Sequence, residues 1–145
     1  MIGDADSREL IETLAVELRE KNIVQAPEWA HIVKTGTSKQ KPPVRGDWWF
    51  VRAAAVLRAI WKLGPIGVSK LRVKYGGKKN NGYTPAHFRK GSGKIIRLIL
   101  QQYEKEGLVK QVSVNGRKGR ALTQKGKELL TSMAKKSFEN PKTDR

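Results

Sequence analysis

The chain of 145 residues contains no cysteine and only two histidines, His31 and His87. The missing thiols exclude disulfides, thiolate catalysis and cysteine zinc sites. The first ten residues, MIGDADSREL, lack a basic segment followed by an apolar run, so we expect no signal peptide. The most apolar stretch is interrupted by three cations and is too short to span a membrane. These absences favour a soluble, intracellular protein.

Acidic residues are also scarce, and one long span has none. The chain has 30 Lys and Arg against 13 Asp and Glu, for a net charge of +17. Residues 1–28 carry seven acids and three bases, whereas residues 48–103 carry twelve bases and no acid. Such a span repels itself unless a polyanion is bound, which indicates a nucleic-acid partner. Without nearby carboxylates or paired histidines, we expect no catalytic residue, no metal site and no cofactor.

The sequence DWWFVRAAAVLRAIWKL, residues 47–63, predicts a central amphipathic helix. At about 100° per residue, Arg52, Arg58 and Lys62 share one third of its circumference, and the rest is apolar. The apolar part is too wide for one neighbour, so this helix should lie at the centre of the domain. The narrow arc is completed by Trp48, Ala55 and Ala59. Small alanines there would let a phosphate backbone approach, although a solvated stripe would show the same pattern.

Periodicity and capping residues predict the other elements. Helices are expected at residues 6–22, 27–33, 67–75, 92–106 and 123–136, and a hairpin at 108–122 with its turn at Asn115-Gly116. The first helix has an acidic outer face and should pack on the central helix. Residues 34–46 and 76–91 have no apolar period, so both are predicted to be basic loops. In the second loop, Tyr83 and Phe88 would either stack on RNA bases or return to the core.

The order of these elements predicts a mainly α, winged-helix-like domain around a central amphipathic helix, with one small β-hairpin wing. We expect a single domain over residues 1–145. It would comprise N-terminal helices and a basic loop (1–46), a winged-helix-like core (47–136) and a frayed tail (137–145).

Five collinear motifs carry a resemblance to a known family. They are PEWA at 27–30, DWWFVRAAAVLRAIW at 47–61, GVSKLRVKYGGKKNNG at 67–82, PAHFRKGSGKIIRLILQQYE at 85–104 and GRALTQKG at 119–126. Together they resemble the small-subunit ribosomal protein of the S-nineteen, e-type family of archaea and eukaryotes. The resemblance implies a structural, non-enzymatic constituent of cytoplasmic ribosomes that binds ribosomal RNA in the small-subunit head and supports subunit maturation and assembly. The short tail and the weakly acidic stretch around residues 45–46 favour an archaeal source.

The resemblance also points to the RNA-binding residues. The family's basic helical face corresponds to Arg52, Arg58 and Lys62, and its second basic region to Arg97 and the preceding loop. With the other cations of the basic span and the wing, the predicted RNA-binding set is Arg52, Arg58, Lys62, Lys70, Arg72, Lys74, Lys78, Lys79, Arg89, Lys90, Lys94, Arg97, Arg117, Lys118 and Arg120.

Two partner classes follow from the resemblance, small-subunit ribosomal RNA and neighbouring small-subunit proteins. We expect no membrane, no small-molecule substrate and a monomer when the chain is free. The alternative is a winged-helix DNA-binding transcription regulator, which would insert the helix at 92–106 into a DNA major groove. Such regulators usually dimerise, and the sequence shows no spare apolar stripe or heptad for a dimer.

Overall fold

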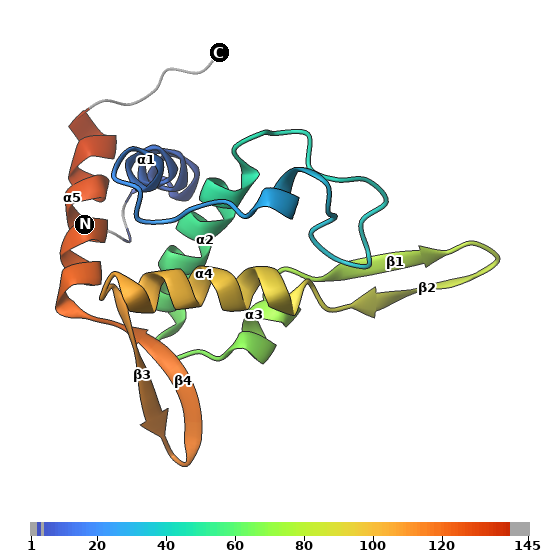
Figure 1. Cartoon of the computed structure of the whole chain (residues 1–145). Helices are drawn as coiled ribbons and strands as arrows, with labels where there is room; N and C mark the ends of the chain where they lie inside the picture. Colours follow the sequence, from blue (N-terminus) through green and yellow to red (C-terminus); the bar gives the residue numbers. More distant parts are fainter. Residues whose placement is uncertain (1–2, 4, 140–145) are drawn as a thin grey trace.

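The computed structural model describes residue 3 and residues 5–139, and it has the predicted mainly α, winged-helix-like architecture (Figure 1). The elements in chain order are α1 (Ser7–Glu20), the 3-10 helix η1 (Glu28–His31), α2 (Trp48–Leu63), α3 (Val68–Lys74), β1 (Gly77–Asn81), β2 (Thr84–Arg89), α4 (Gly93–Lys105), β3 (Val109–Val114), β4 (Arg117–Leu122) and α5 (Gln124–Glu139). The wing is the hairpin β3–β4. No helix in this described part of the chain is long and apolar enough to cross a membrane.

Helix α2 occupies the centre of the core, as its wide apolar side predicts. Ala53, Ala54 and Leu57 have no exposed surface. Helices α1 and α4 and the wing strand β4 pack around α2. The fully buried Tyr103 of α4 donates its hydroxyl to the carbonyl of Ala53, so this buried polar atom has a partner. Burial raises the pKa of Tyr103 well above its usual value.

Helix α1 forms because an apolar residue recurs every three to four positions behind a capping aspartate. The Asp6 carboxylate accepts the backbone N–H of Arg8 at 3.0 Å. The fully buried Leu10, Leu14 and Leu18 face the core, and α1 packs on both α2 and α5. The predicted packing of the acidic helix on the central helix is therefore confirmed.

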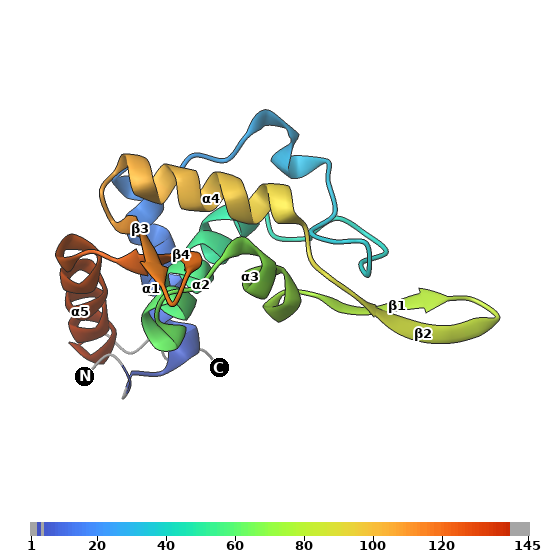
Figure 2. The same ribbon diagram turned by 90° about the horizontal axis from the view of Figure 1, so that it is seen from below.

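The segment 76–91 is not the loop that the sequence predicts, because it forms a second antiparallel hairpin, β1–β2. Lys79 lies opposite His87 and Gly77 lies opposite Arg89. Every residue of β2 is exposed, so the strand lacks the apolar alternation by which half-buried strands are recognised. The hairpin projects from the body of the protein (Figures 1 and 2). The expectation of a single hairpin was wrong.

Other differences are local. The segment 27–33 contains only the short 3-10 helix η1, and Pro27 precedes it instead of starting it. Trp48 and Ala59, expected on the narrow arc, are buried. Trp48 turns inward because its indole N–H donates to the carbonyl of Ala30 at 2.9 Å. Helix α5 continues to Glu139, past the predicted end, and the last predicted tail residues, 140–145, lie outside the described residues.

Candidate nucleic-acid interface

Arg52, on the cationic arc of α2, lies against Tyr75, the residue that follows α3. The guanidinium carbon of Arg52 is 4.4 Å from the centroid of the Tyr75 ring, which is a cation–π distance. Burial lowers the pKa of Arg52, although arginine keeps its charge in proteins, and burial also raises the pKa of Tyr75. The charge of Arg58 acts on Tyr75 as well. The Arg52 guanidinium therefore lies over a half-buried aromatic ring on which the charge of Arg58 also acts.

Arg58 has an unusual local environment. Its Nε atom is buried and has no hydrogen-bond partner among the described residues. A buried N–H donor without an acceptor costs about 1–3 kcal/mol. Arg58 as a whole is half-buried, so part of the residue remains open to a polyanion.

A cleft of about 360 Å³ separates the cationic arc from the basic segment 34–46. Lys39, Lys41 and Arg52 contribute cations to its lining, and Ala55 contributes a small side chain. None of the described lining residues is acidic. The predicted approach over Ala55 is thus open to a polyanion, whereas Ala59 is buried.

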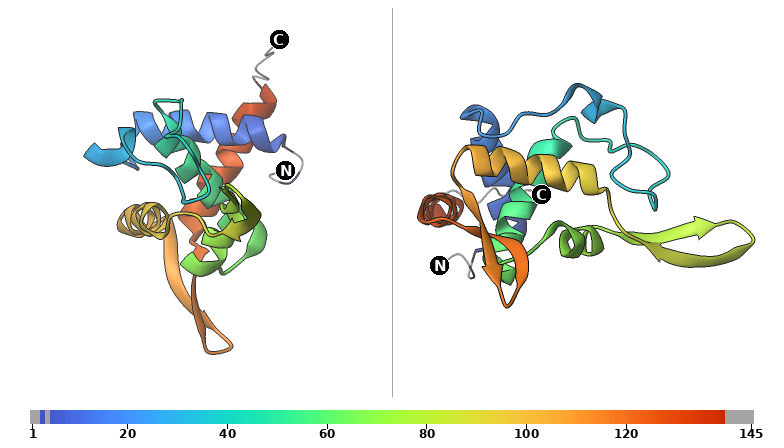
Figure 3. Two further views of the ribbon diagram at one scale, coloured as in Figure 1. Left: turned by 90° about the vertical axis from the view of Figure 1, so that its right-hand side faces the viewer. Right: turned by 60° about the horizontal axis from the view of Figure 1, so that its bottom comes forward.

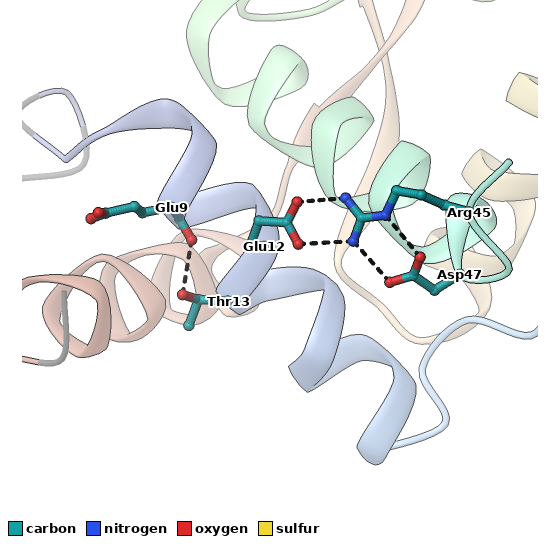
Figure 4. A network of polar contacts seen from close by, with 5 residues as sticks. All are labelled: Glu9, Glu12, Thr13, Arg45 and Asp47. Atoms are coloured by element: carbon teal, nitrogen blue, oxygen red, sulfur yellow. Dashed lines mark hydrogen bonds and ion pairs between the residues drawn. The ribbon is translucent and has the colours of Figure 1, made fainter. Parts of the chain in front are cut away.

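Arg45 also lines this cleft, but its charge is already matched by carboxylates. Its guanidinium donates to Glu12 at 2.7 and 3.0 Å and to Asp47 at 3.0 and 3.1 Å (Figure 4). The hydrogen bonds to Glu12 and Asp47 raise the pKa of Arg45, and its guanidinium lowers the pKa of Asp47. Arg45 thus fastens the end of segment 34–46 to α1 and to the start of α2, which positions the basic loop.

A second basic cluster forms where β2 leads into α4. Arg72 Nε donates to the carbonyl of Gly91 at 2.9 Å, and the Gly91 N–H donates to the carbonyl of Arg72 at 2.9 Å. A Cβ atom at Gly93 would lie 2.9 Å from Arg97 Nη1 and 3.2 Å from Arg72 Cδ. The absence of a side chain at Gly93 therefore lets two arginines converge beside the first turn of α4. Arg72, a member of the predicted RNA-binding set, is half-buried.

A groove of about 710 Å³ lies beside this cluster, between segment 34–46 and the base of the hairpin. Its basic lining residues are Lys34, Arg72, Arg89 and Lys90, and none of the described lining residues is acidic. Arg72, Arg89 and Lys90 belong to the predicted set. The fold brings them together from α3, from β2 and from the connection between β2 and α4. Lys34 was not in that set, because an aperiodic loop gives no indication of where it folds back.

The hairpin β1–β2 presents cations on both faces. Directly opposed residues of an antiparallel pair point to the same side, so Lys79, His87 and Arg89 share one face. Lys78 shares the other face with Phe88. His87 was considered only as a catalytic group from sequence, because its cationic neighbours become apparent only with the strand register.

The two aromatic residues of the hairpin do not return to the core. Tyr83, at the tip, has a relative accessibility of 110% and Phe88 has one of 49%. This removes one of the two alternatives that the sequence leaves open for them. Tyr83 lies outside the predicted RNA-binding set.

The remaining predicted cations differ in whether they are exposed or engaged in an ion pair. Those that lie exposed are Lys62, Lys70, Lys74, Lys94, Arg97, Arg117 and Lys118. Arg120 instead pairs with Glu104 of α4, and its backbone N–H and C=O bond to Ile66 at 2.9 and 3.1 Å. Arg120 therefore joins the wing to the helical core. The wing and the hairpin β1–β2 extend in different directions (Figures 1 and 3), so the predicted residues do not form one patch.

Comparison with known proteins finds similarity to one ribosomal family. The family model described as Ribosomal protein S19e matches residues 1–140. The chain is 46% identical over 132 residues to small ribosomal subunit protein eS19 of Aeropyrum pernix, covering 90% of this chain and 84% of that protein. It is 38% identical over 139 residues to eS19B of Schizosaccharomyces pombe, covering 96% and 95%. It is 37% identical over 139 residues to eS19G of Ascaris suum, covering 96% and 93%.

Proposed function

We propose that this chain, which belongs to the ribosomal protein S19e family, binds small-subunit ribosomal RNA through the basic surface around segment 34–46 and thereby supports subunit maturation and assembly. Membership of the family makes the chain a structural constituent of the small subunit of cytoplasmic ribosomes, and not an enzyme. Neighbouring small-subunit proteins are its other expected partners.

The observation that carries the proposal is the concentration of cations around two acid-free grooves. One groove is lined by Lys39, Lys41 and Arg52, and the other by Lys34, Arg89 and Lys90. Residues 48–103 supply no carboxylate that could neutralise them. A phosphate backbone would relieve this repulsion and release its own counterions on binding.

Arg52 and Arg58 form the part of the surface that is organised before RNA binds. Stacking on Tyr75 restricts the Arg52 guanidinium, so less side-chain freedom is lost when a phosphate is bound. The half-buried Arg58 lies on the same cationic arc, where its charge would attract the same polyanion. Arg120, by contrast, is engaged by Glu104, so we expect it to contribute less to RNA affinity than the exposed wing residues Arg117 and Lys118.

The test is binding of the purified chain to a transcript of small-subunit ribosomal RNA across a range of salt concentrations. If about six cations contact phosphates, the slope of log K against log salt should be near −4 for unpaired strands and steeper for duplex RNA. Arg58→Ala should make the slope shallower by roughly 0.7 to 0.9. Lys135→Ala, an exposed cation on α5, is the matched control and should leave the slope unchanged.

Two results would contradict the proposal. A slope shallower than about −1 would mean that the basic grooves are only a solvated surface. Tight, sequence-specific binding to duplex DNA at the same salt concentration, with weak binding to the transcript, would favour the DNA-binding regulator instead.

A further inference from the structure

We propose that the hairpin β1–β2 is an RNA-binding arm whose tip residue, Tyr83, stacks on an unpaired RNA base. This inference rests on the proposed function, because it assumes that the chain binds ribosomal RNA. It adds a contact to a base, which the phosphate contacts of the two grooves do not provide.

The hairpin reaches well beyond the core. Every residue of β2 is exposed, and the hairpin extends past the N-terminal end of α4 in Figures 1 and 2 and in the right-hand view of Figure 3. A two-stranded hairpin without an apolar face is at best marginally stable by itself. We therefore expect its stabilising contacts to come from a bound partner.

Tyr83 occupies the tip of this arm. With a relative accessibility of 110%, it is the most exposed large hydrophobic side chain in the described part of the chain. A ring so placed contributes nothing to the core, and it is free on both sides for stacking. Exposed single apolar residues are common, so the argument depends on how the ring is held and on which charges surround it.

Side-chain hydrogen bonds on both sides of Tyr83 hold the turn. Asn80 Oδ1 accepts the N–H of Gly82 at 2.9 Å, and Asn81 Nδ2 donates to the carbonyl of Pro85 at 3.2 Å. Gly82 has a φ of 76°, a left-handed conformation that suits glycine. A tyrosine on such a turn is presented at low entropic cost, because its backbone is fixed and its side chain has few rotatable bonds.

The charges along the arm identify RNA as the partner. Lys79 and Arg89 line one face, Lys78 lies on the other, and Lys90 follows the arm. An acidic protein surface would match these charges, but its carboxylates provide no flat face on which Tyr83 could stack. A single-stranded or looped RNA offers both, since its phosphates follow the strand and its unpaired bases expose their faces.

The experiment is filter binding of the full chain to a transcript of small-subunit ribosomal RNA. Tyr83→Ala should weaken binding roughly 5- to 150-fold, the loss expected for one stacked base. Its salt slope should equal that of the wild type, because no phosphate contact is lost. Tyr83→Phe should bind as the wild type does, because it keeps the ring, whereas Tyr83→Leu should bind as weakly as Tyr83→Ala.

Two further variants serve as references. Lys79→Ala should make the salt slope shallower by roughly 0.7 to 0.9, unlike any Tyr83 variant. Phe138→Ala removes another exposed aromatic ring, on α5, and should leave affinity and slope unchanged. Circular dichroism and thermal melting of each variant should match the wild type, since both aromatic side chains are exposed.

The outcomes separate this inference from the proposed function. If the wild type does not bind the transcript, the proposed function fails and the inference fails with it. If the wild type binds with the expected salt slope and Tyr83→Ala binds equally well, only the inference is overturned. If Tyr83→Leu binds as tightly as the wild type, an apolar side chain without a flat ring is sufficient for the contact, and base stacking is overturned.

Discussion

Replacing Leu14 by alanine tests whether the acidic helix α1 is a structural element of the core. Leu14 has a relative accessibility of 0% and lies on the stripe of α1 that packs on α2. Truncation of such a leucine removes buried apolar surface and leaves a cavity, at a cost of about 2–5 kcal/mol. Each kcal/mol should lower the melting temperature of a domain of this size by roughly 2–4 °C. The expected decrease is therefore about 4–20 °C.

The assay is thermal unfolding followed by circular dichroism, with Val16→Ala as the matched control on the same helix. Val16 has a relative accessibility of 46%, so its truncation should change stability by less than about 0.5 kcal/mol. At a temperature where both variants are folded, their affinities for the ribosomal RNA transcript should be equal, because α1 carries none of the proposed RNA contacts. Equal melting temperatures for the two variants would refute the assignment of α1 to the core.

Two other predictions concern buried charge. Ala53→Glu would place a carboxylate at a position with no exposed surface. Its cost should approach the whole free energy of unfolding of a typical protein, about 5–15 kcal/mol. The variant should therefore be insoluble or lack a cooperative melting transition. A soluble, folded Ala53→Glu protein would show that the helical phase assigned to α2 is wrong. Glu17 is held by Lys21, which directly follows α1, at 2.5 Å and by Lys136 of α5 at 3.4 Å, and the hydrogen bond from Lys21 is the largest cause of its lowered pKa. Its stabilising effect is therefore complete above its usual pKa of 4.5 and is lost as the pH falls through the lower folded value. The difference in melting temperature between the wild type and Glu17→Gln should thus be present at pH 7 and shrink below pH 4.5, and a difference that does not vary with pH would contradict this reasoning.

The helices and turns of this fold were predictable where an apolar period or a capping residue marks them. The bounds of α2, the cap of α4 at Ser92 and the turn at Asn115-Gly116 all agree with the sequence-based expectation. The hairpin β1–β2 was not predictable, because its strands bury no apolar face and side-chain hydrogen bonds near Gly82 hold its turn. The inward orientation of Trp48 was also not predicted, because the acceptor of its indole N–H is the carbonyl of Ala30 in η1, which is far from Trp48 in the sequence.

The candidate site was predictable as a charge distribution but not as a geometry. The acid-free span identified the cations, and the fold shows that many of them are exposed. Sequence could not show that Arg120 pairs with Glu104, that Arg52 stacks on Tyr75 or that Arg45 is held by Glu12. Each of these contacts joins different elements or a loop to a helix, so their partners become apparent only after folding.

The most direct test of the central claim is whether the tagged chain sediments with small ribosomal subunits. Lysate is taken from cells that express both the wild type and Arg58→Ala, and the incorporation of the two proteins is compared. Arg58→Ala should melt at the wild-type temperature or above it, because alanine favours helix and the substitution removes a buried donor that has no described acceptor. The wild type should co-sediment with small subunits, and the folded Arg58→Ala protein should be depleted from them, because each lost phosphate contact weakens its competition for the site. A wild-type chain that stays at the top of the gradient would contradict the claim that it is a constituent of the small subunit, and equal incorporation of both proteins would contradict the role of the α2 cationic arc.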